Sequence, residues 1–182
     1  HFFVLDEAMS RLRKLNVDMV FCRDVIMHQP FPFDFLKKIC DVPSHMVLMR
    51  LRTWDVGKTV LDPEQSCQLN YGQWAPYMIL NSDEIVSFLK RQFPTIFRIT
   101  FVKHYMPLGG HHWRFVPNDC YLDETKTAET ACLIEKNNKH NTDIDVKNIV
   151  QSESCGRMIT AKMAAKMLLM LHQRLGGKRV WW

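Results

Sequence analysis

The stretch that decides the fold runs from residue 18 to residue 30 and reads DMVFCRDVIMHQP. Its first apolar residues continue a run that begins at Val17, and such a run is typical of a parallel strand covered on both faces. A charged Arg-Asp pair follows at once, and a Gln-Pro dipeptide then breaks the chain. The stretch therefore predicts a buried strand over residues 17–21, with the acid Asp24 and the imidazole of His28 just beyond its end.

Helical and extended patterns alternate along the rest of the chain. Apolar residues at helical spacing predict helices over residues 3–15, 33–40, 82–93 and 158–175. Short apolar or alternating runs predict further strands over residues 46–51, 96–102 and 130–134. Strands that alternate with helices imply βαβ units and a mainly parallel sheet. The last two strands have no helix between them, so we expect a terminal antiparallel hairpin at one edge.

Two polar segments interrupt this pattern. Residues 53–74 lack periodicity and contain glycine and proline, which predicts a long irregular loop. Residues 137–154 are polar as well, and we expect a connector there. Ser82 is followed by two acids and is the expected N-cap of the third helix. The chain is thus divided into an α/β domain over residues 1–136 and, over residues 137–182, a connector and a helix that packs on that domain.

Composition and length favour one domain with its own core. The chain has 182 residues, of which 47% are hydrophobic, and this is too apolar for global disorder. No apolar run reaches the roughly 20 residues that span a bilayer, so we predict a soluble protein with no membrane partner. The cysteines form no CxxC pair, which favours reduced thiols and an intracellular location. The chain begins at His1 rather than Met, and we expect either processing or a longer parent product.

The net charge of +5 permits contact with RNA or another acidic partner. No run of five like charges occurs, however, and no RNA-recognition signature is present. His104, His111 and His112 do not predict a metal site, because adjacent histidines of a strand point to opposite faces and no further ligand completes a set. A protein or RNA assembly partner therefore stays open, and no metal is expected.

Residues 23–28 carry Arg-Asp-Val, an aliphatic residue, one further residue and His. After a hydrophobic strand, this order resembles the fourth-strand motif of a subgroup of class I S-adenosylmethionine-dependent methyltransferases. Residues 70–74, Asn-Tyr-Gly-Gln-Trp, are similar to the Asn…Gly-x-Trp segment that such proteins place after the fifth strand. The two late strands would be the family's terminal antiparallel strands. The resemblance is closest over residues 17–105, leaves residues 140–182 unexplained, and implies a partial Rossmann-like methyltransferase sheet.

The resemblance also implies a site, since ligands of such sheets bind beyond the carboxyl ends of parallel strands. Asp24 would accept a hydrogen bond from the methyl acceptor or from the ammonium group of the cofactor. His28 would orient the acceptor or take its proton, and these two residues are the expected catalytic pair. The residues expected to bind substrate are Arg23, Asn70, Tyr71 and Trp74. Tyr71 and Trp74 would wall the pocket, where cation–π attraction to a sulfonium is worth about 1 kcal/mol.

Most of these residues also have a purely structural interpretation. Asp24 could cap the turn after the strand, and His28 could be a loop histidine with satisfied hydrogen bonds. Arg23 could pair with a neighbouring acid, and Trp74 could simply pack. The sequence leaves both interpretations open.

The chain departs from the family where the cofactor binds. Family members hold S-adenosylmethionine on a glycine-rich turn after the first strand, where backbone and ligand must approach closely. None of the seven glycines forms GxG after an amino-terminal strand, and only one helix fits before Val17. We therefore expect either a methyltransferase with its cofactor half upstream, acting on a small molecule, protein or RNA, or an inactive methyltransferase-fold scaffold in a larger, ribonucleoprotein-like assembly. A third interpretation is an unrelated α/β domain associated with nucleic acid.

Overall fold

The computed structural model describes residue 14 and residues 17–105, 115–116 and 127–151. The helix expected over residues 158–175 lies outside the described residues, and so does the helix expected over residues 3–15, apart from Lys14. Also outside them are His111, His112, Cys120 and Cys155.

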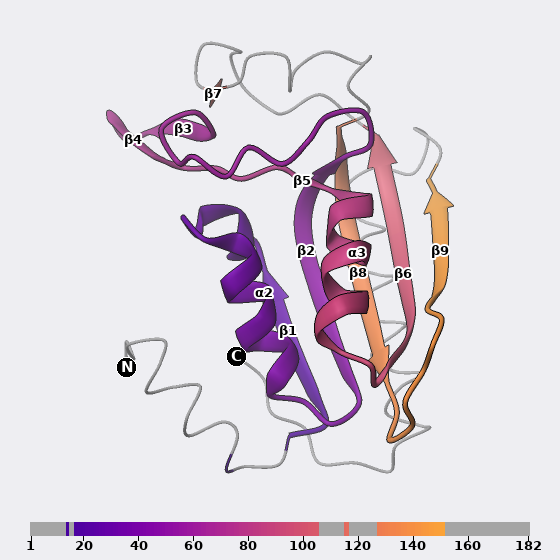
Figure 1. Ribbon diagram of the computed structural model, residues 1–182. Helices are drawn as coiled ribbons and strands as arrows, with labels where there is room; N and C mark the ends of the chain where they lie inside the picture. Colours follow the sequence, from indigo (N-terminus) through magenta and orange to yellow (C-terminus); the bar gives the residue numbers. More distant parts are fainter. Residues whose placement is uncertain (1–13, 15–16, 106–114, 117–126, 152–182) are drawn as a thin grey trace.

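A six-stranded sheet forms the centre of the described chain (Figure 1). Its strands are β1 (Met19–Arg23), β2 (Met46–Trp54), β5 (Leu80–Asn81), β6 (Ile96–Tyr105), β8 (Ala128–Lys136) and β9 (Asp145–Val150). Their order is β1-β2-β8-β6-β9, and β5 pairs with the end of β2. β1 is parallel to β2 and β9 is parallel to β6, whereas β8 is antiparallel to both β2 and β6. The predicted α/β class is confirmed, with a sheet of mixed direction.

The two late strands pair antiparallel as predicted, but they do not lie at the edge of the sheet. β8 is inserted between β2 and β6, and β9 occupies the edge. β9 comes from the segment that was expected to be a connector, so that expectation is wrong for Asp145–Val150. The residues of β9 are exposed along the whole strand, and its apolar residues Val146, Ile149 and Val150 do not alternate with polar ones, so its sequence shows no clear strand period.

Two helices cover one face of the main sheet (Figure 1). α2 spans Pro32–Asp41 and α3 spans Ser82–Gln92, close to their predicted bounds. Both helices share one hydrophobic cluster with β2, and its most deeply buried members include Leu36, Ile39, Met49, Leu51, Ile85 and Leu89. Burying one such side chain contributes about 1.5–3 kcal/mol. This cluster holds the carboxyl ends of β1 and β2 in place against the helices.

The strand β2 is covered on both faces, as its continuous apolar run predicted, whereas β1 lies at the edge of the sheet and is mostly half-buried. Met49 belongs to the cluster under the helices, whereas Met46 and Leu48 point to the other face and form a second cluster. Phe21 packs against this second cluster. The strand predicted over residues 17–21 is therefore confirmed, with its observed bounds two residues later.

The N-cap of α3 is Asn81 and not Ser82, which corrects the prediction. The Asn81 side chain accepts hydrogen bonds from the backbone N–H groups of Asp83 and Glu84, at 2.9 and 3.1 Å. Ser82 is the first residue of the helix, and its hydroxyl donates instead to Asp55 at 2.9 Å. Both residue types are good caps, so the sequence alone did not separate them.

A second sheet contains β3 (Cys67–Asn70), β4 (Gln73–Pro76) and β7 (Phe115–Val116). We call the β3–β4 hairpin the arm, and Figure 1 shows it to one side of the main sheet, beyond the start of α2. Its turn holds Tyr71 and Gly72 at φ 49° and 79°, as in the turns that favour two-residue hairpins. The expectation of an irregular loop over residues 53–74 is therefore wrong for the arm, whose strands are too short to show a clear period.

Candidate functional site

Asp24 follows β1 directly, at the carboxyl end of a parallel strand. Its backbone has φ 55°, a left-handed conformation that is uncommon outside glycine and is concentrated at functional sites. The Asp24 N–H donates to the Arg50 carbonyl at 3.0 Å. Asp24 Oδ1 accepts from Arg50 Nε at 2.8 Å, and Oδ2 accepts from Arg23 Nε at 3.3 Å. The structure thus holds both the backbone and the carboxylate of Asp24 in a defined position.

The arginines of β2 extend this network to β8. Arg50 Nη1 lies 3.2 Å from Glu129 Oε1, and Arg52 Nη2 lies 3.6 Å from Glu129 Oε2. Burial opposes the charge of Arg50, but the hydrogen bond to Asp24 and the charge of Glu129 outweigh it and raise the pKa of Arg50. The Nη1 atom of Arg52 is buried and has no hydrogen-bond partner within the described ranges. One guanidinium nitrogen of the network is therefore buried without a hydrogen-bond partner among the described residues.

His28 ends the short 3-10 helix Ile26–His28 that follows Asp24. Its Nδ1 lies 3.1 Å from the carbonyl oxygen of Pro76, and its ring meets the Tyr77 ring edge-on at 5.6 Å between centroids. A carbonyl oxygen can only accept, so Nδ1 carries the hydrogen in the neutral ring. The Nε2 atom of this exposed side chain then keeps its lone pair and is the nitrogen that can accept a proton.

This geometry predicts the tautomer of His28. Long-range ¹H–¹⁵N correlation spectra at a pH where the ring is neutral are expected to show the Nδ1–H form in clear excess, because that form alone donates to Pro76. His140, an exposed histidine with no ring hydrogen bond among the described residues, is the reference within the same sample. An Nε2–H form in excess at His28 would contradict the assignment of its basic nitrogen.

The predicted substrate residues of the arm lie in two different places. Trp74 is 52% exposed and lines a groove of about 430 Å³ together with Pro76. Because the Pro76 carbonyl also accepts from His28, the structure brings Trp74 and His28 into neighbouring positions. Tyr71, fully exposed, and Asn70 belong to the hairpin tip and are not among the residues that line this groove.

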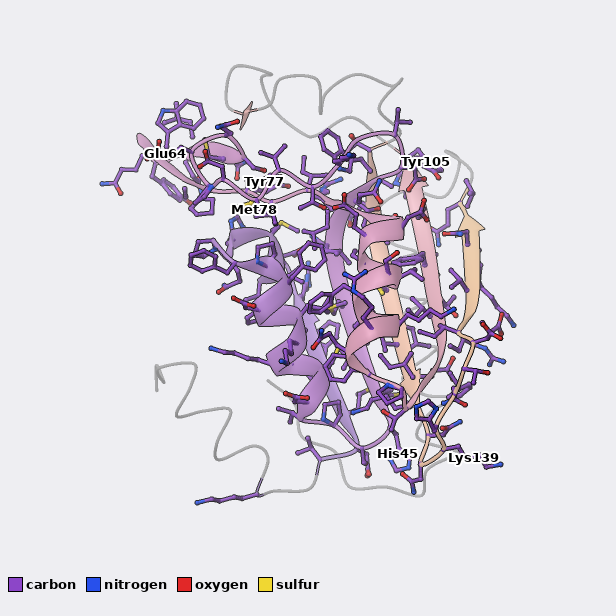
Figure 2. The ribbon with its side chains drawn as sticks, in the orientation of Figure 1. His45, Glu64, Tyr77, Met78, Tyr105 and Lys139 are labelled. Atoms are coloured by element: carbon purple, nitrogen blue, oxygen red, sulfur yellow. The ribbon has the colours of Figure 1, made fainter. Side chains whose placement is uncertain are left out.

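A polar cluster that sequence reasoning missed lies where β2 and β6 end. Asp55 Oδ1 accepts from Ser82 Oγ at 2.9 Å and from Lys103 Nζ at 2.7 Å, and Oδ2 accepts from Tyr105 Oη at 2.6 Å. The Lys103 side chain is 4% exposed, so its ammonium depends on Asp55 for charge compensation. Figure 2 shows Tyr105 at this end of β6. The members come from three separate segments, and no local pattern indicates that they meet.

The Asp55 cluster predicts a specific dependence of stability on pH. Burial alone would raise the pKa of Asp55, but the hydrogen bonds from Lys103 and Tyr105 outweigh it and lower that pKa below its ordinary value. A lowered pKa stabilises the fold above the unfolded-state pKa of about 3.9, and this contribution is lost as the pH falls through the folded-state pKa. In urea unfolding, the stability difference between wild type and Asp55→Asn should be constant above about pH 5 and narrow below about pH 4. A difference that persists unchanged at pH 3 would contradict the assignment.

The described part of the chain offers neither a thiol pair nor a metal cluster. Cys22, Cys40, Cys67 and Cys132 are buried free thiols, in keeping with the prediction of reduced cysteines. Burial raises the pKa of Cys22 to about 11 and that of Cys40 to about 12, which makes both thiols poor nucleophiles. Among the described residues, no group of three or more His, Cys, Asp or Glu could hold a metal ion.

The fold and the site define a mixed α/β domain with a polar network at the carboxyl ends of β1 and β2. A scan of the chain against models of known protein families finds no match, and a search of curated proteins finds no significant relative. In the part of the chain that the structure describes, no helix is long and apolar enough to cross a membrane.

Proposed function

We propose that this chain is the acceptor-side half of an S-adenosylmethionine-dependent methyltransferase, with Asp24 and His28 at its centre. The observation that carries the proposal is the left-handed Asp24 at the carboxyl end of a parallel strand, followed after one short turn by His28 with its Nε2 free. Ligands of α/β sheets bind at this rim. The acceptor would be a small molecule, a protein or an RNA.

The strand arrangement supports the same proposal. The parallel neighbours β1 and β2 correspond to the fourth and fifth strands in the resemblance, and the antiparallel pair β6 and β8 corresponds to the terminal strands. The arm follows β2, where the resemblance expects its Asn…Gly-x-Trp segment. The parallel pairing of β1 with β2 and the antiparallel pairing of β6 with β8 support the proposal, although β8 lies between β2 and β6 and not at an edge.

The described residues do not by themselves fit the cofactor. Gly57 packs against the Trp54 indole, with a Cβ at Gly57 meeting ring atoms at 2.6–2.8 Å, and Gly72 lies in the hairpin turn. Neither glycine belongs to a GxG turn after a strand. We therefore assign no cofactor loop to the described residues, and only Asp24 among them would contact the cofactor, by accepting a hydrogen bond from its ammonium group. Asp24 accepts from two arginines, but a carboxylate has about four acceptor positions, so room for an acceptor hydroxyl or amine remains.

In this proposal the described residues act on the methyl acceptor and not on the cofactor's methyl group. The Nε2 atom of His28 can take a proton from an acceptor nucleophile, while Asp24 can fix its orientation. Each of these actions uses an atom whose hydrogen-bonding state follows from the contacts described above.

Calorimetric titration with S-adenosylhomocysteine tests the proposal on the product of the complete reading frame. Saturable binding is expected, and Asp24→Asn should weaken it about tenfold, the effect of losing one charge-assisted hydrogen bond. Asparagine tolerates the left-handed conformation, so the fold should survive. The matched control is Asp34→Asn, an exposed acid in the first turn of α2, which should change nothing. No binding heat from a folded sample would overturn the proposal.

The second candidate is an inactive scaffold of the same fold within a protein or RNA assembly. The pairing of the Asp24 carboxylate with two arginines favours it, because a residue so engaged can serve structure alone. The net charge of +5 makes RNA the natural acidic partner to test. Affinity for RNA should then fall steeply as salt rises, and a flat salt response would remove RNA as the partner of this scaffold.

A further inference from the structure

The groove beside the arm is built from residues of the hairpin and of the turn that precedes β3. It is lined by Pro63, Glu64, Cys67, Trp74, Ala75 and Pro76. Cys67 pairs with Pro76 across the hairpin, and Leu69 pairs with Trp74, so the Trp74 and Cys67 side chains lie on the same face. The result is a shallow, mostly apolar floor with half of an indole open to solvent.

A single carboxylate gives this groove its charge. Glu64 makes no side-chain hydrogen bond or ion pair within the described ranges, and no lysine or arginine lines the groove. The turn that carries it is rigid, because Asp62 accepts from the Glu64 N–H at 3.0 Å and from Gln65 Nε2 at 2.8 Å. Figure 2 shows Glu64 at the same end of the molecule as Tyr77 and Met78. An unpaired carboxylate beside an open indole face is a site with net negative character.

The chemistry of this site selects one class of ligand. We propose that the groove binds an alkylammonium group. The cation would lie against the Trp74 ring and beside the Glu64 carboxylate, and its methyl or methylene groups would cover the prolines. An anion would meet the unpaired carboxylate, and a metal ion would find too few ligands. The Cys67 thiol does not add one, because burial and the nearby Glu64 raise its pKa and keep it protonated.

An alkylammonium ligand would specify which kind of methyl acceptor the proposed function uses. Only its role as acceptor rests on the proposed function. Pro76 lines the groove with its ring and holds His28 through its carbonyl. An amine-bearing acceptor held by Trp74 and Glu64 would therefore lie on the segment that also positions His28, although the His28 ring does not itself line the groove. Binding itself needs neither His28 nor the cofactor.

The test compares choline with its neutral isostere 3,3-dimethylbutan-1-ol. The readout is the Trp74 indole N–H resonance, assigned with Trp74→Phe because the chain has five tryptophans. Choline should shift this resonance saturably with a millimolar Kd, and the neutral alcohol should bind at least about fivefold more weakly. Equal binding of the two ligands, or shifts only at other tryptophans, would overturn the proposal.

Variants of Glu64 and Trp74 separate the contribution of the carboxylate charge to binding from that of the aromatic ring. Glu64→Gln and Trp74→Leu should each weaken choline binding about fivefold, whereas Trp74→Phe should lose less. Asp83→Asn removes an exposed carboxylate on α3 and should leave the affinity unchanged. Both altered groove side chains are exposed, so the fold should not depend on them. Unchanged affinity in Glu64→Gln would overturn the proposal.

Two sources of the ammonium group are then distinguished. Tighter binding of N-acetyl-lysine methylamide than of choline supports a polypeptide acceptor, and the reverse order supports a small amine. Choline binding without any response to S-adenosylhomocysteine would remove the methyltransferase proposal and keep this site. Cofactor-product binding without choline binding would do the opposite.

Discussion

The Asp55→Asn variant is expected to unfold with a free energy about 3 kcal/mol below that of the wild-type chain. Lys103 is 4% exposed and lies 2.7 Å from Asp55, so the variant leaves a buried ammonium without a counter-charge. An asparagine also offers one acceptor oxygen to three donors, namely Ser82 Oγ, Lys103 Nζ and Tyr105 Oη. The value is at the low end for a broken buried pair because the Asp55 side chain is 28% exposed. Urea unfolding at pH 7 measures it.

A double-mutant cycle with Lys103→Met is the control for this prediction. Methionine keeps the length of the side chain and removes the charge, so the double variant should be more stable than Asp55→Asn alone. Tyr105→Phe removes one hydrogen bond and should cost about 1 kcal/mol. A loss below about 0.5 kcal/mol in Asp55→Asn would mean that Lys103 reaches solvent and that the pair is an ordinary surface contact.

Local patterns predicted the elements that bury a continuous or periodic apolar face. The strand after Val17, the helix around Leu36 and Ile39, and the strand from Met46 each carry enough apolar side chains to determine their own structure. The strands of the arm are too short for a clear pattern, and the apolar residues of β9 are exposed and do not alternate. β9 is held by pairing with β6, and the arm by its turn at Gly72, and both depend on partners that no local window contains.

The candidate site, too, could be predicted only as far as it depends on local sequence. That Asp24 and His28 follow a parallel strand could be predicted, because a buried strand predicts where its own end lies. Their contacts could not be, since Arg50 is 26 residues from Asp24 and Pro76 is 48 residues from His28. The Asp55 cluster shows the limit most clearly. Lys103 comes directly after the strand predicted over residues 96–102, where a lysine indicates a solvent-facing position. The observed Lys103 side chain is instead buried and paired with Asp55.

Glu129→Gln is expected to lower the free energy of unfolding by about 3 kcal/mol. The Glu129 side chain is 13% exposed and faces two guanidinium groups, from Arg50 at 3.2 Å and Arg52 at 3.6 Å. Arg50 keeps Asp24 as a partner in the variant, but Arg52 loses its only ion pair among the described residues and already has an unpartnered Nη1. Most of the loss should therefore come from the uncompensated charge of Arg52.

Glu135→Gln on the same strand is the matched control for Glu129. Its carboxylate lies 3.8 Å from Arg98, which keeps a closer partner in Asp145 at 2.8 Å, so the loss should stay below about 1 kcal/mol. Combining Glu129→Gln with Arg52→Met should recover part of the lost stability, because the double variant buries no unpaired charge. Equal losses in the two glutamine variants would show that Glu129 is an ordinary surface acid. The ion pairs that reach Asp24 through Arg50 would then contribute little to its position.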